Sequence, residues 1–367
     1  MSAAAPSRGR VRLRELSFDD YEQVAALTSR YGLGGRTEED WRHFWVNNPA
    51  WRKGWPLGWV LENSEGRVVG HMGSIPLAYE LDGRPLVVSA GRAWVVDEEY
   101  RAYASLLLDE LFHQPGVDLW LNTTVNRHAA PLYALFDSPP VPAGHWERAA
   151  FWITNYRGFA QSALRTRVPK LAGALSGPAG AALWTKDFLA RANRRMASDT
   201  TYEIQLEQGF DGRFDAFWFE LREKHDGILR AVRSRAVLEW HFAHHLRRGQ
   251  VWIWTASRDG RMVAYAIFYR KDKAALSLAR VRFVDFQSLD DHAPSFRPML
   301  TRMLDVCRAE GIHVLEDMGC AMTDCRAPHE RTLPSWLFHY QASAALAETL
   351  RDPLRWQPTL FDGDSSL

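Results

Sequence analysis

Hydrophobic and polar positions in the first part of the chain repeat with two different periods. Apolar residues at every second position predict strands. Apolar residues three or four positions apart behind a Ser, Thr or Asp predict capped helices. Together the patterns predict a strand, two helices, three antiparallel strands, a helix, a strand and a helix. In chain order these elements lie within residues 11–16, 21–30, 37–45, 58–62, 67–74, 77–81, 86–96, 97–108 and 122–136. The last of these ranges holds both a strand end and the helix that follows it.

The same order of elements returns in the second part of the chain. A strand, two helices, a hairpin, a strand, a helix and a strand are predicted at residues 201–204, 214–224, 234–245, 250–255 with 261–269, 276–286, 295–310 and 313–318. A further alternating run at 334–340 predicts a last strand. Two copies of one unit are therefore expected, which gives an α+β protein with a unit at 1–157 and another at 201–367.

The segment between the copies has the composition of a linker. Residues 161–200 hold seven Lys or Arg against two Asp or Glu, and a Gly- and Ala-rich run occupies 171–180. We interpret 158–200 as a basic linker with a helix over 185–196. Its charges are typical of a solvated face, and the alternative is a basic surface that meets an acidic lipid or polysaccharide.

Composition excludes several classes of protein. The chain has 367 residues, which is enough for two domains, with 46% hydrophobic and 24% charged residues. A net charge of +1 gives no general reason to expect a nucleic-acid partner. No apolar run approaches the roughly 18 residues that span a bilayer, and the start lacks a signal-peptide core, so we expect a cytoplasmic protein. Its three cysteines, Cys307, Cys320 and Cys325, are expected to be reduced thiols.

Two segments of the first unit carry the pattern of a known site. The strand end Trp94-Val95-Val96 runs through a short turn into a helix, with Arg101 in the turn. About twenty residues later, Asn126 opens a second helix that carries Tyr133. The pair resembles the acyl-CoA site of the GNAT N-acetyltransferase superfamily, and the resemblance spans roughly residues 10 to 157.

The resemblance implies that each unit is a mixed, mostly antiparallel twisted sheet flanked by helices. It also implies that acetyl-CoA or another acyl-CoA is the co-substrate. The residues expected to hold it are Trp94, Val95, Val96, Arg101, Ala102, Tyr103, Ala104, Ser105 and Asn126. The pattern departs from the family at two places, because Ala104 and Leu106 stand where the family has small residues, usually glycine, against the CoA pyrophosphate.

Catalytic roles follow from the same resemblance. Tyr133 stands where the family keeps the tyrosine that protonates the CoA thiolate, although an aromatic on an apolar helix face is also typical of a core residue. A splayed strand at 94–96 would direct a backbone N–H at the developing oxyanion. The general base is left open, and His71 is taken as the candidate because of its ordinary pKa. The other residues weighed for that role are Glu15, Glu80, Arg92 and Asp97.

The second unit is expected to lack the co-substrate. Its corresponding turn, 286–292, has two aspartates and no glycine, which would repel a pyrophosphate. We expect this unit to close the acceptor cleft, as in paired GNAT units and the similar Fem-type aminoacyltransferases.

Three other groups of residues were considered. The end of the chain, 356–367, carries apolar anchors and is either frayed or docked near the cleft, where Asp362 or Asp364 could meet a cationic amine. Cys320 and Cys325, with His313 and His329, lack the Cys-x-x-Cys spacing of a structural zinc site. His241 and His245 lie one helical turn apart, a spacing that can chelate a metal, but no acidic third ligand follows, so we interpret them as part of an aromatic helix surface.

The sequence therefore predicts an acyl-CoA-dependent N-acyltransferase whose acceptor is a primary amine of a small molecule or an amino sugar. Two alternatives stay open. One is a Fem-type transferase that uses aminoacyl-tRNA, and the other is a catalytically silent binding protein, which Ala104 and Leu106 favour. Neither the acyl chain length nor the oligomeric state follows from the sequence.

Overall fold

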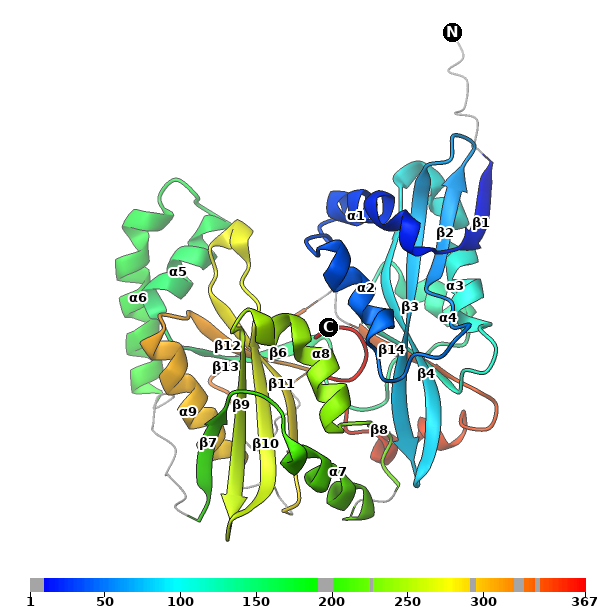
Figure 1. Cartoon of the computed structure of the whole chain (residues 1–367). Helices are drawn as coiled ribbons and strands as arrows, with labels where there is room; N and C mark the ends of the chain where they lie inside the picture. The colour runs from blue at the N-terminus through cyan, green and yellow to red at the C-terminus, as the bar shows by residue number, and fades with distance from the viewer. Residues whose placement is uncertain (1–9, 191–200, 225–226, 291–294, 320–326, 334–336) are drawn as a thin grey trace.

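The computed structural model describes residues 10–190, 201–224, 227–290, 295–319, 327–333 and 337–367. It shows two sheets side by side, each flanked by helices, which is the predicted α+β architecture in two units (Figure 1). Each sheet has seven strands within these residues.

The first sheet is antiparallel except for one parallel pair, β4 with β5. Its strands, in spatial order, are β1 (Val11–Glu15), β2 (Gly58–Asn63), β3 (Val68–Leu81), β4 (Arg84–Val96), β5 (Leu119–Val125) and β14 (Leu337–Ala342), with the short β8 (Arg230–Ala231) on β3.

Helices cover both faces of this sheet because neighbouring strand residues point to opposite sides. Val60 belongs to the core formed with α1 (Tyr21–Arg30) and α2 (Glu38–Val46). Leu61 belongs to the core formed with α3 (Ala104–Phe112) and α4 (Ala130–Leu135). The site described below lies where these two cores meet at β4.

The second sheet repeats this plan. Its spatial order is β13 (His329–Thr332), β6 (Arg148–Ile153), β12 (Val314–Met318), β11 (Arg280–Ser288), β10 (Arg261–Arg270), β9 (Val251–Arg258) and β7 (Glu203–Glu207). Its helices are α7 (Gly212–Lys224), α8 (Arg235–Arg247) and α9 (Phe296–Ala309). Short 3-10 turns lie at Phe18–Asp20, Glu98–Tyr103, Ala274–Leu276, Thr349–Arg351 and Pro353–Arg355.

The two units exchange a strand, which the sequence analysis does not predict. β6 lies near the end of the predicted first unit, 1–157, but pairs with β12 in the second sheet. β14 lies near the end of the predicted second unit, 201–367, but pairs with β5 in the first sheet. Each sheet therefore needs a strand from the other half of the chain, and the two units are held together by backbone hydrogen bonds as well as by packing.

The segment predicted as a linker is folded, so that prediction is corrected. Residues 156–189 form α5 (Tyr156–Arg165) and α6 (Ala172–Leu189), and the predicted helix start at 185 lies near the end of α6. The remainder of that prediction, 191–196, lies outside the described residues. A Cβ at Gly180 would come within 3.0 Å of the Arg157 backbone, so small residues let the two helices approach closely rather than marking a flexible chain.

One core is shared by both units. It includes Phe44 and Ile75 from the first unit, Phe242 and Tyr265 from the second, and Phe361 from the end of the chain. The C-terminal segment 356–367 thus docks between the units, where Figure 1 shows the chain end. Among the described residues no helix is both long and apolar enough to cross a membrane. Cys307 is a free, buried thiol, and Cys320 and Cys325 lie outside the described residues.

Candidate functional site

A β-bulge interrupts β4 opposite β3. Arg92 pairs with Gly73 and Val95 pairs with His71, so two β4 residues, Ala93 and Trp94, face one residue of β3. Ala93 has a φ of +51°, which lies in the left-handed region that few non-glycine residues adopt. Strain of this kind is held in place by its surroundings and is common at functional sites.

The β4 strand also separates from β5 at this point, as the sequence predicts. Their parallel pairing covers Val88–Ala90 opposite Leu119–Leu121 and then ends. Val95 and Val96, which were predicted to line the co-substrate site, are buried and stay paired with β3. The region where the two strands are no longer paired is called the β4–β5 split below.

Tyr133 fills part of this split from α4. Its hydroxyl donates a hydrogen bond to Asn122 Oδ1 on β5 at 3.2 Å. Its ring lies edge-on to Trp94, with 5.7 Å between the ring centroids, and 5.3 Å from the ring of His339 on β14. Burial, followed by the nearby Asp364 carboxylate, raises the pKa of Tyr133, so the hydroxyl keeps its proton at neutral pH.

Unsatisfied polar atoms surround Tyr133. Within the described part of the chain, Trp94 Nε1, Asn122 Nδ2 and His339 Nε2 are buried without a hydrogen-bond partner. An unpaired buried polar group costs about 1–3 kcal/mol, so these atoms are suited to a polar ligand that enters the split. The two amides of a pantetheine arm supply both donors and acceptors of that kind, so the residues here fit that part of an acyl-CoA.

The C-terminal segment reaches the same place. Asp364 Oδ1 accepts a hydrogen bond from Thr123 Oγ1 on β5 at 2.6 Å, and Asp364 Oδ2 lies 3.3 Å from Nη1 of Arg92 on β4. The carboxylate therefore lies between the strands that diverge. Asp362, the other tail aspartate singled out in the sequence, instead lies 3.5 Å from Arg233 and accepts a hydrogen bond from Tyr79.

The predicted pyrophosphate turn is acidic. Asp97 pairs with Arg30, and it also accepts a hydrogen bond from Tyr31. Arg101 is exposed and lies 3.5 Å from Glu98, so its guanidinium extends toward solvent. The turn is a 3-10 helix at Glu98–Tyr103 that leads directly into α3.

Other predicted residues of this turn differ in exposure. Ala102 is exposed, Tyr103 and Ser105 are half-buried, and Ala104 is buried under α3. Leu106 is 39% exposed and therefore does not plug the bend. The carboxylates of this turn, rather than the missing glycines, would repel a pyrophosphate.

Asn126 and His71 are the two remaining predicted site residues. Asn126 is exposed, and its Oδ1 accepts hydrogen bonds from the backbone N–H groups of His128 and Ala129. His71 Nδ1 lies 3.0 Å from the Ala93 carbonyl oxygen, so this ring holds the bulge. Burial lowers the pKa of His71 to about 4, which makes it a weak base.

A pocket opens on the opposite face of the bulge. It has about 520 Å³ of empty space, its open mouth included. α1, α2 and the glycine-rich loop between them form its walls, with Trp41, Phe44 and Trp45 from α2. Arg92, Ala93 and His71 form its floor. The bulge thus separates an aromatic pocket on one face of the sheet from the Tyr133 cluster on the other.

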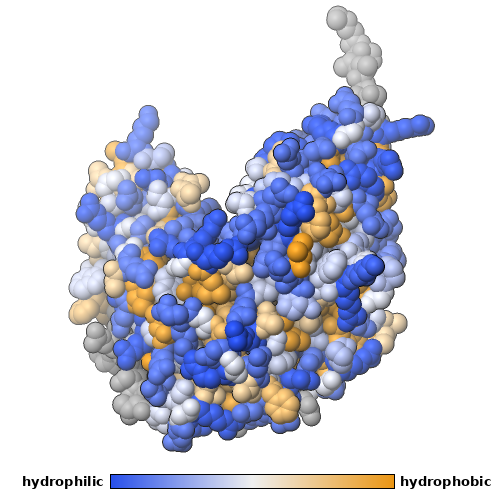
Figure 2. Space-filling view, viewed as in Figure 1, coloured by the Kyte–Doolittle hydropathy of each residue, from blue (hydrophilic) through white to orange (hydrophobic). Residues whose placement is uncertain are grey.

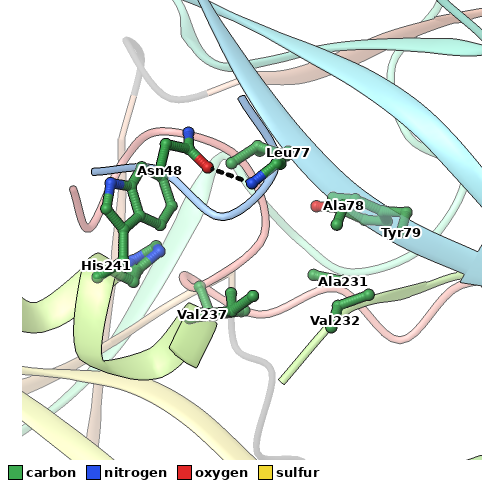
Figure 3. A pocket seen from close by; sticks show the side chains of 11 residues that line it. Asn48, Leu77, Ala78, Tyr79, Ala231, Val232, Val237 and His241 are labelled. Carbon is green, nitrogen blue, oxygen red and sulfur yellow. Dashed lines mark hydrogen bonds between the residues drawn. The ribbon is translucent and has the colours of Figure 1, made fainter. Parts of the chain in front are cut away.

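A smaller pocket, with about 300 Å³ of empty space including its open mouth, lies between the two units, beside the C-terminal segment. Figure 3 shows Tyr79 from β3, His241 from α8 and Asn48 around it. His241 Nε2 lies 2.7 Å from Ser366 Oγ. The described residues contain no group of His, Cys, Asp and Glu that could hold a metal ion.

The corresponding turn of the second unit is also closed by ion pairs. Asp290 accepts a hydrogen bond from Tyr202 at 2.8 Å and lies 2.7 Å from Arg258. Asp291 and His292 lie outside the described residues.

The sequence analysis did not identify two groups of residues near this site. Arg36 lines the pocket from the loop before α2, and Lys271 directly follows β10. Arg233 and Asp285 form a buried ion pair at 2.8 Å that fixes the C-terminal segment. An arginine directly after Gly34-Gly35, before a capped helix, was the one local signal available.

Comparisons with known proteins agree with this description of the fold. No family model matches the chain, and no curated protein matches it in sequence. Among solved structures, yeast (Saccharomyces cerevisiae) N-myristoyltransferase with bound myristoyl-CoA is similar at 12% identity and a TM-score of 0.58, over 90% of this chain and 79% of that one.

Two bacterial structures are similar as well. A GCN5-related N-acetyltransferase from Anabaena variabilis matches at 11% identity and a TM-score of 0.55, over 91% of this chain and 73% of that chain. A probable N-acyltransferase from Enterococcus faecalis matches at 10% identity and a TM-score of 0.54, with the same coverage. At these identities the likeness shows the fold, and the chain has the GNAT fold in two units.

Proposed function

We propose that the protein is an acyl-CoA-dependent N-acyltransferase that acts on a primary amine of a small molecule or an amino sugar. The N-terminal unit carries the chemistry. The observation that supports this most strongly is the β4–β5 split, with a bulge on one side, Tyr133 inside it, and buried polar atoms that need partners.

The bulge and Tyr133 would each meet one requirement of acyl transfer. Ala93 and Trp94 stand opposite one residue of β3, so the bulge releases a backbone N–H that can stabilise negative charge on the thioester oxygen. Tyr133, kept protonated by burial, can donate its proton to the departing CoA sulfur. Trp94, Asn122 and Asn126 would line the path of the pantetheine arm.

The amine would approach from the pocket on the other face of the bulge. Arg92 lines that pocket and contacts Asp364, which places a carboxylate beside the reacting carbon. Asp364 can therefore attract the protonated amine and accept a proton from it. His71, with its lowered pKa, acts through the Ala93 carbonyl and positions the bulge.

Acyl chain length is part of the proposal. The yeast N-myristoyltransferase structure holds myristoyl-CoA, so long-chain thioesters are candidates beside acetyl-CoA. A catalytically silent binding protein is the second candidate, because Asp97, Glu98 and Glu99 surround the turn that would meet the pyrophosphate.

Turnover of thioesters tests the proposal. Release of free CoA thiol is measured with acetyl-, octanoyl- and myristoyl-CoA against a panel of amines, including amino sugars and amino acids. Amine-dependent thiol release with at least one pair supports the transferase. Binding of CoA thioesters without release for any pair supports the silent binding protein, and indifference to every CoA thioester contradicts both.

A further inference from the structure

Two guanidinium groups meet at one aromatic ring in the wall of the pocket. Arg36 Cζ lies 4.8 Å from the centroid of the Phe44 ring, and Arg92 Cζ lies 4.3 Å from the same centroid. Both arginines line the pocket, Arg36 from the loop before α2 and Arg92 from the bulge. Like charges that share one ring repel each other, which costs folding free energy unless an anion lies between them.

A third cation, which belongs to the second unit, is repelled by both arginines. Lys271 follows β10, and its Nζ lies 5.9 Å from the centroid of the Tyr269 ring. Lys271 is exposed, and Figure 2 shows a hollow between the upper parts of the two units. Loss of hydration, followed by the repulsion of Arg282, Arg92 and other arginines, lowers the pKa of Lys271 to about 8.

The carboxylates nearby are already paired. Asp364 contacts Arg92 and Thr123, Asp40 contacts His244 and Arg247, and Glu316 contacts Arg280, Arg282 and Arg331.

Arg36 and Lys271 remain without a charged partner. Among the described residues neither has a carboxylate within 4.0 Å. Burial, followed by repulsion from Arg92, lowers the pKa of Arg36 to about 9. Arg36 is half-buried and Lys271 is exposed. Because Arg36 also shares the Phe44 ring with a second guanidinium, the arrangement is typical of a site completed by an anionic ligand.

We propose that this pocket selects an acceptor whose amine is accompanied by a carboxylate or a phosphate, and that Arg36 and Lys271 bind this anionic group. The inference rests on the proposed function for the role of the amine. Guanidinium groups match both anions because their N–H groups form two parallel hydrogen bonds. Trp41, Trp45 and Val24 line the remaining wall, so the body of the acceptor is apolar.

The polarity of binding follows from the two ends of the pocket. Asp364 lies beside Arg92 at the bulge and attracts the amine. Arg36 comes from the loop before α2 and attracts the anion. An acceptor held at both ends has one orientation, with its nitrogen toward the thioester.

Matched amines test this selection in the complete protein. Transfer is measured to L-phenylalanine and to 2-phenylethylamine, which lacks only the carboxylate, and to O-phosphoethanolamine and ethanolamine, which differ in the phosphate. One charged hydrogen bond is worth roughly a factor of 10 to 100, so we expect kcat/KM to favour the charged member of at least one pair by that factor. Which pair shows the preference distinguishes a carboxylate from a phosphate.

Variants connect the preference to the cations. Arg36→Met and Lys271→Met should each raise KM for the charged amine about tenfold and leave KM for the neutral amine unchanged. Arg36→Met should not lower Tm, because it removes an uncompensated charge. Arg351→Met is the matched control, since Arg351 is an exposed arginine paired with Glu348.

A binding readout separates this inference from the proposed function. Titration calorimetry with L-phenylalanine and with inorganic phosphate, without any CoA compound, measures the anion site alone. Binding that is lost in Arg36→Met, in a protein that transfers no acyl group, supports the anion site and contradicts the transferase. Equal use of charged and neutral amines, or a higher KM for acyl-CoA in Arg36→Met, overturns the inference while leaving the transferase in place.

Discussion

The Asp364 carboxylate lies 3.3 Å from the Arg92 guanidinium, although 272 positions separate the two residues in the chain. The contact joins the C-terminal segment to the strand that carries the bulge. A residue near the end of the sequence therefore belongs to the site of the first unit, and the site is complete only when both units are folded together.

Gly363 should be required for that contact. Its φ of +89° favours glycine, and a Cβ there would come within 2.2 Å of Thr123 Cγ2. We expect Gly363→Ala to displace the segment, to lower the free energy of unfolding by about 1–3 kcal/mol, and to reduce turnover. Urea denaturation and the thiol-release assay measure the two effects.

Two variants separate the clash from the backbone strain. Gly54→Ala has nearly the same φ, +88°, with nothing within 4 Å of the new Cβ, so it should show the strain alone. Thr123→Ser removes Cγ2 and keeps the hydroxyl that binds Asp364, so it should restore part of the stability of Gly363→Ala. Equal losses in Gly54→Ala and Gly363→Ala, without rescue, would show that the close approach is unimportant.

Tyr133→Phe should remove the proton donor and leave binding intact. We expect kcat to fall by roughly 10²- to 10⁴-fold, with the dissociation constant for acyl-CoA changed less than about threefold. The loss of the hydrogen bond to Asn122 should cost about 1 kcal/mol of stability.

The matched control is Tyr340→Phe, which removes another tyrosine hydroxyl, one that donates to the Leu350 carbonyl oxygen at 3.0 Å. It should cost similar stability and leave kcat unchanged. An equal fall of kcat in both variants would assign Tyr133 to the core instead of the chemistry.

The buried Arg233–Asp285 pair should contribute strongly to the attachment of the C-terminal segment. Its two hydrogen bonds are 2.8 and 3.0 Å long, and both side chains are at most 2% exposed. Removing one partner leaves a buried charge, so we expect Asp285→Asn to lower the free energy of unfolding by about 3–5 kcal/mol.

A double-mutant cycle measures the interaction between the two side chains. Arg233→Met combined with Asp285→Asn should cost roughly 1–3 kcal/mol less than the sum of the single changes. Purely additive losses would mean that each residue acts through its other neighbours, such as Thr359, which donates to Asp285.

Stability should fall as the pH falls below about 6.5, and His245 should account for part of the slope. Its ring lies 4.8 Å from the Tyr269 ring, and neither ring nitrogen has a partner. Burial, followed by repulsion from Lys271, lowers the pKa of His245 to about 3. Between pH 6.5 and 3 the unfolded chain binds a proton that the folded chain rejects, which costs roughly 1.4 kcal/mol per pH unit.

His245→Phe removes that proton site. We expect little change in the free energy of unfolding at pH 7.5 and a shallower decrease between pH 6.5 and 5, measured by urea denaturation at each pH. His71, with a pKa of about 4, should maintain part of the slope in the variant. Identical slopes in the two proteins would contradict the account of His245.

Local patterns predicted most elements of both units. The helix at Tyr21–Arg30 begins and ends as predicted, and Thr37 caps the next helix by accepting from Asp40 N–H. The split at β4 follows from the resemblance. These features are determined by residues that are close together in the chain, so the sequence pattern is enough to predict them.

Long-range pairing could not be predicted in the same way. The exchange of β6 and β14 depends on which edge each strand meets, and alternation is the same on either sheet. The glycine-rich run in α6 was wrongly interpreted as linker because composition does not show a partner helix. Arg36 lies in a loop and Lys271 follows β10, far apart in the chain, so no local motif could reveal that their charges act together.

Hydrogen exchange with and without acyl-CoA tests most directly the claim that the β4–β5 split holds the pantetheine arm. We predict that saturating acetyl- or myristoyl-CoA slows exchange at residues 94–105 and 122–126, and leaves the matching strands of the second unit, 280–288 and 314–318, unchanged. Protection confined to the second unit, or no protection anywhere, would contradict the assignment of the site.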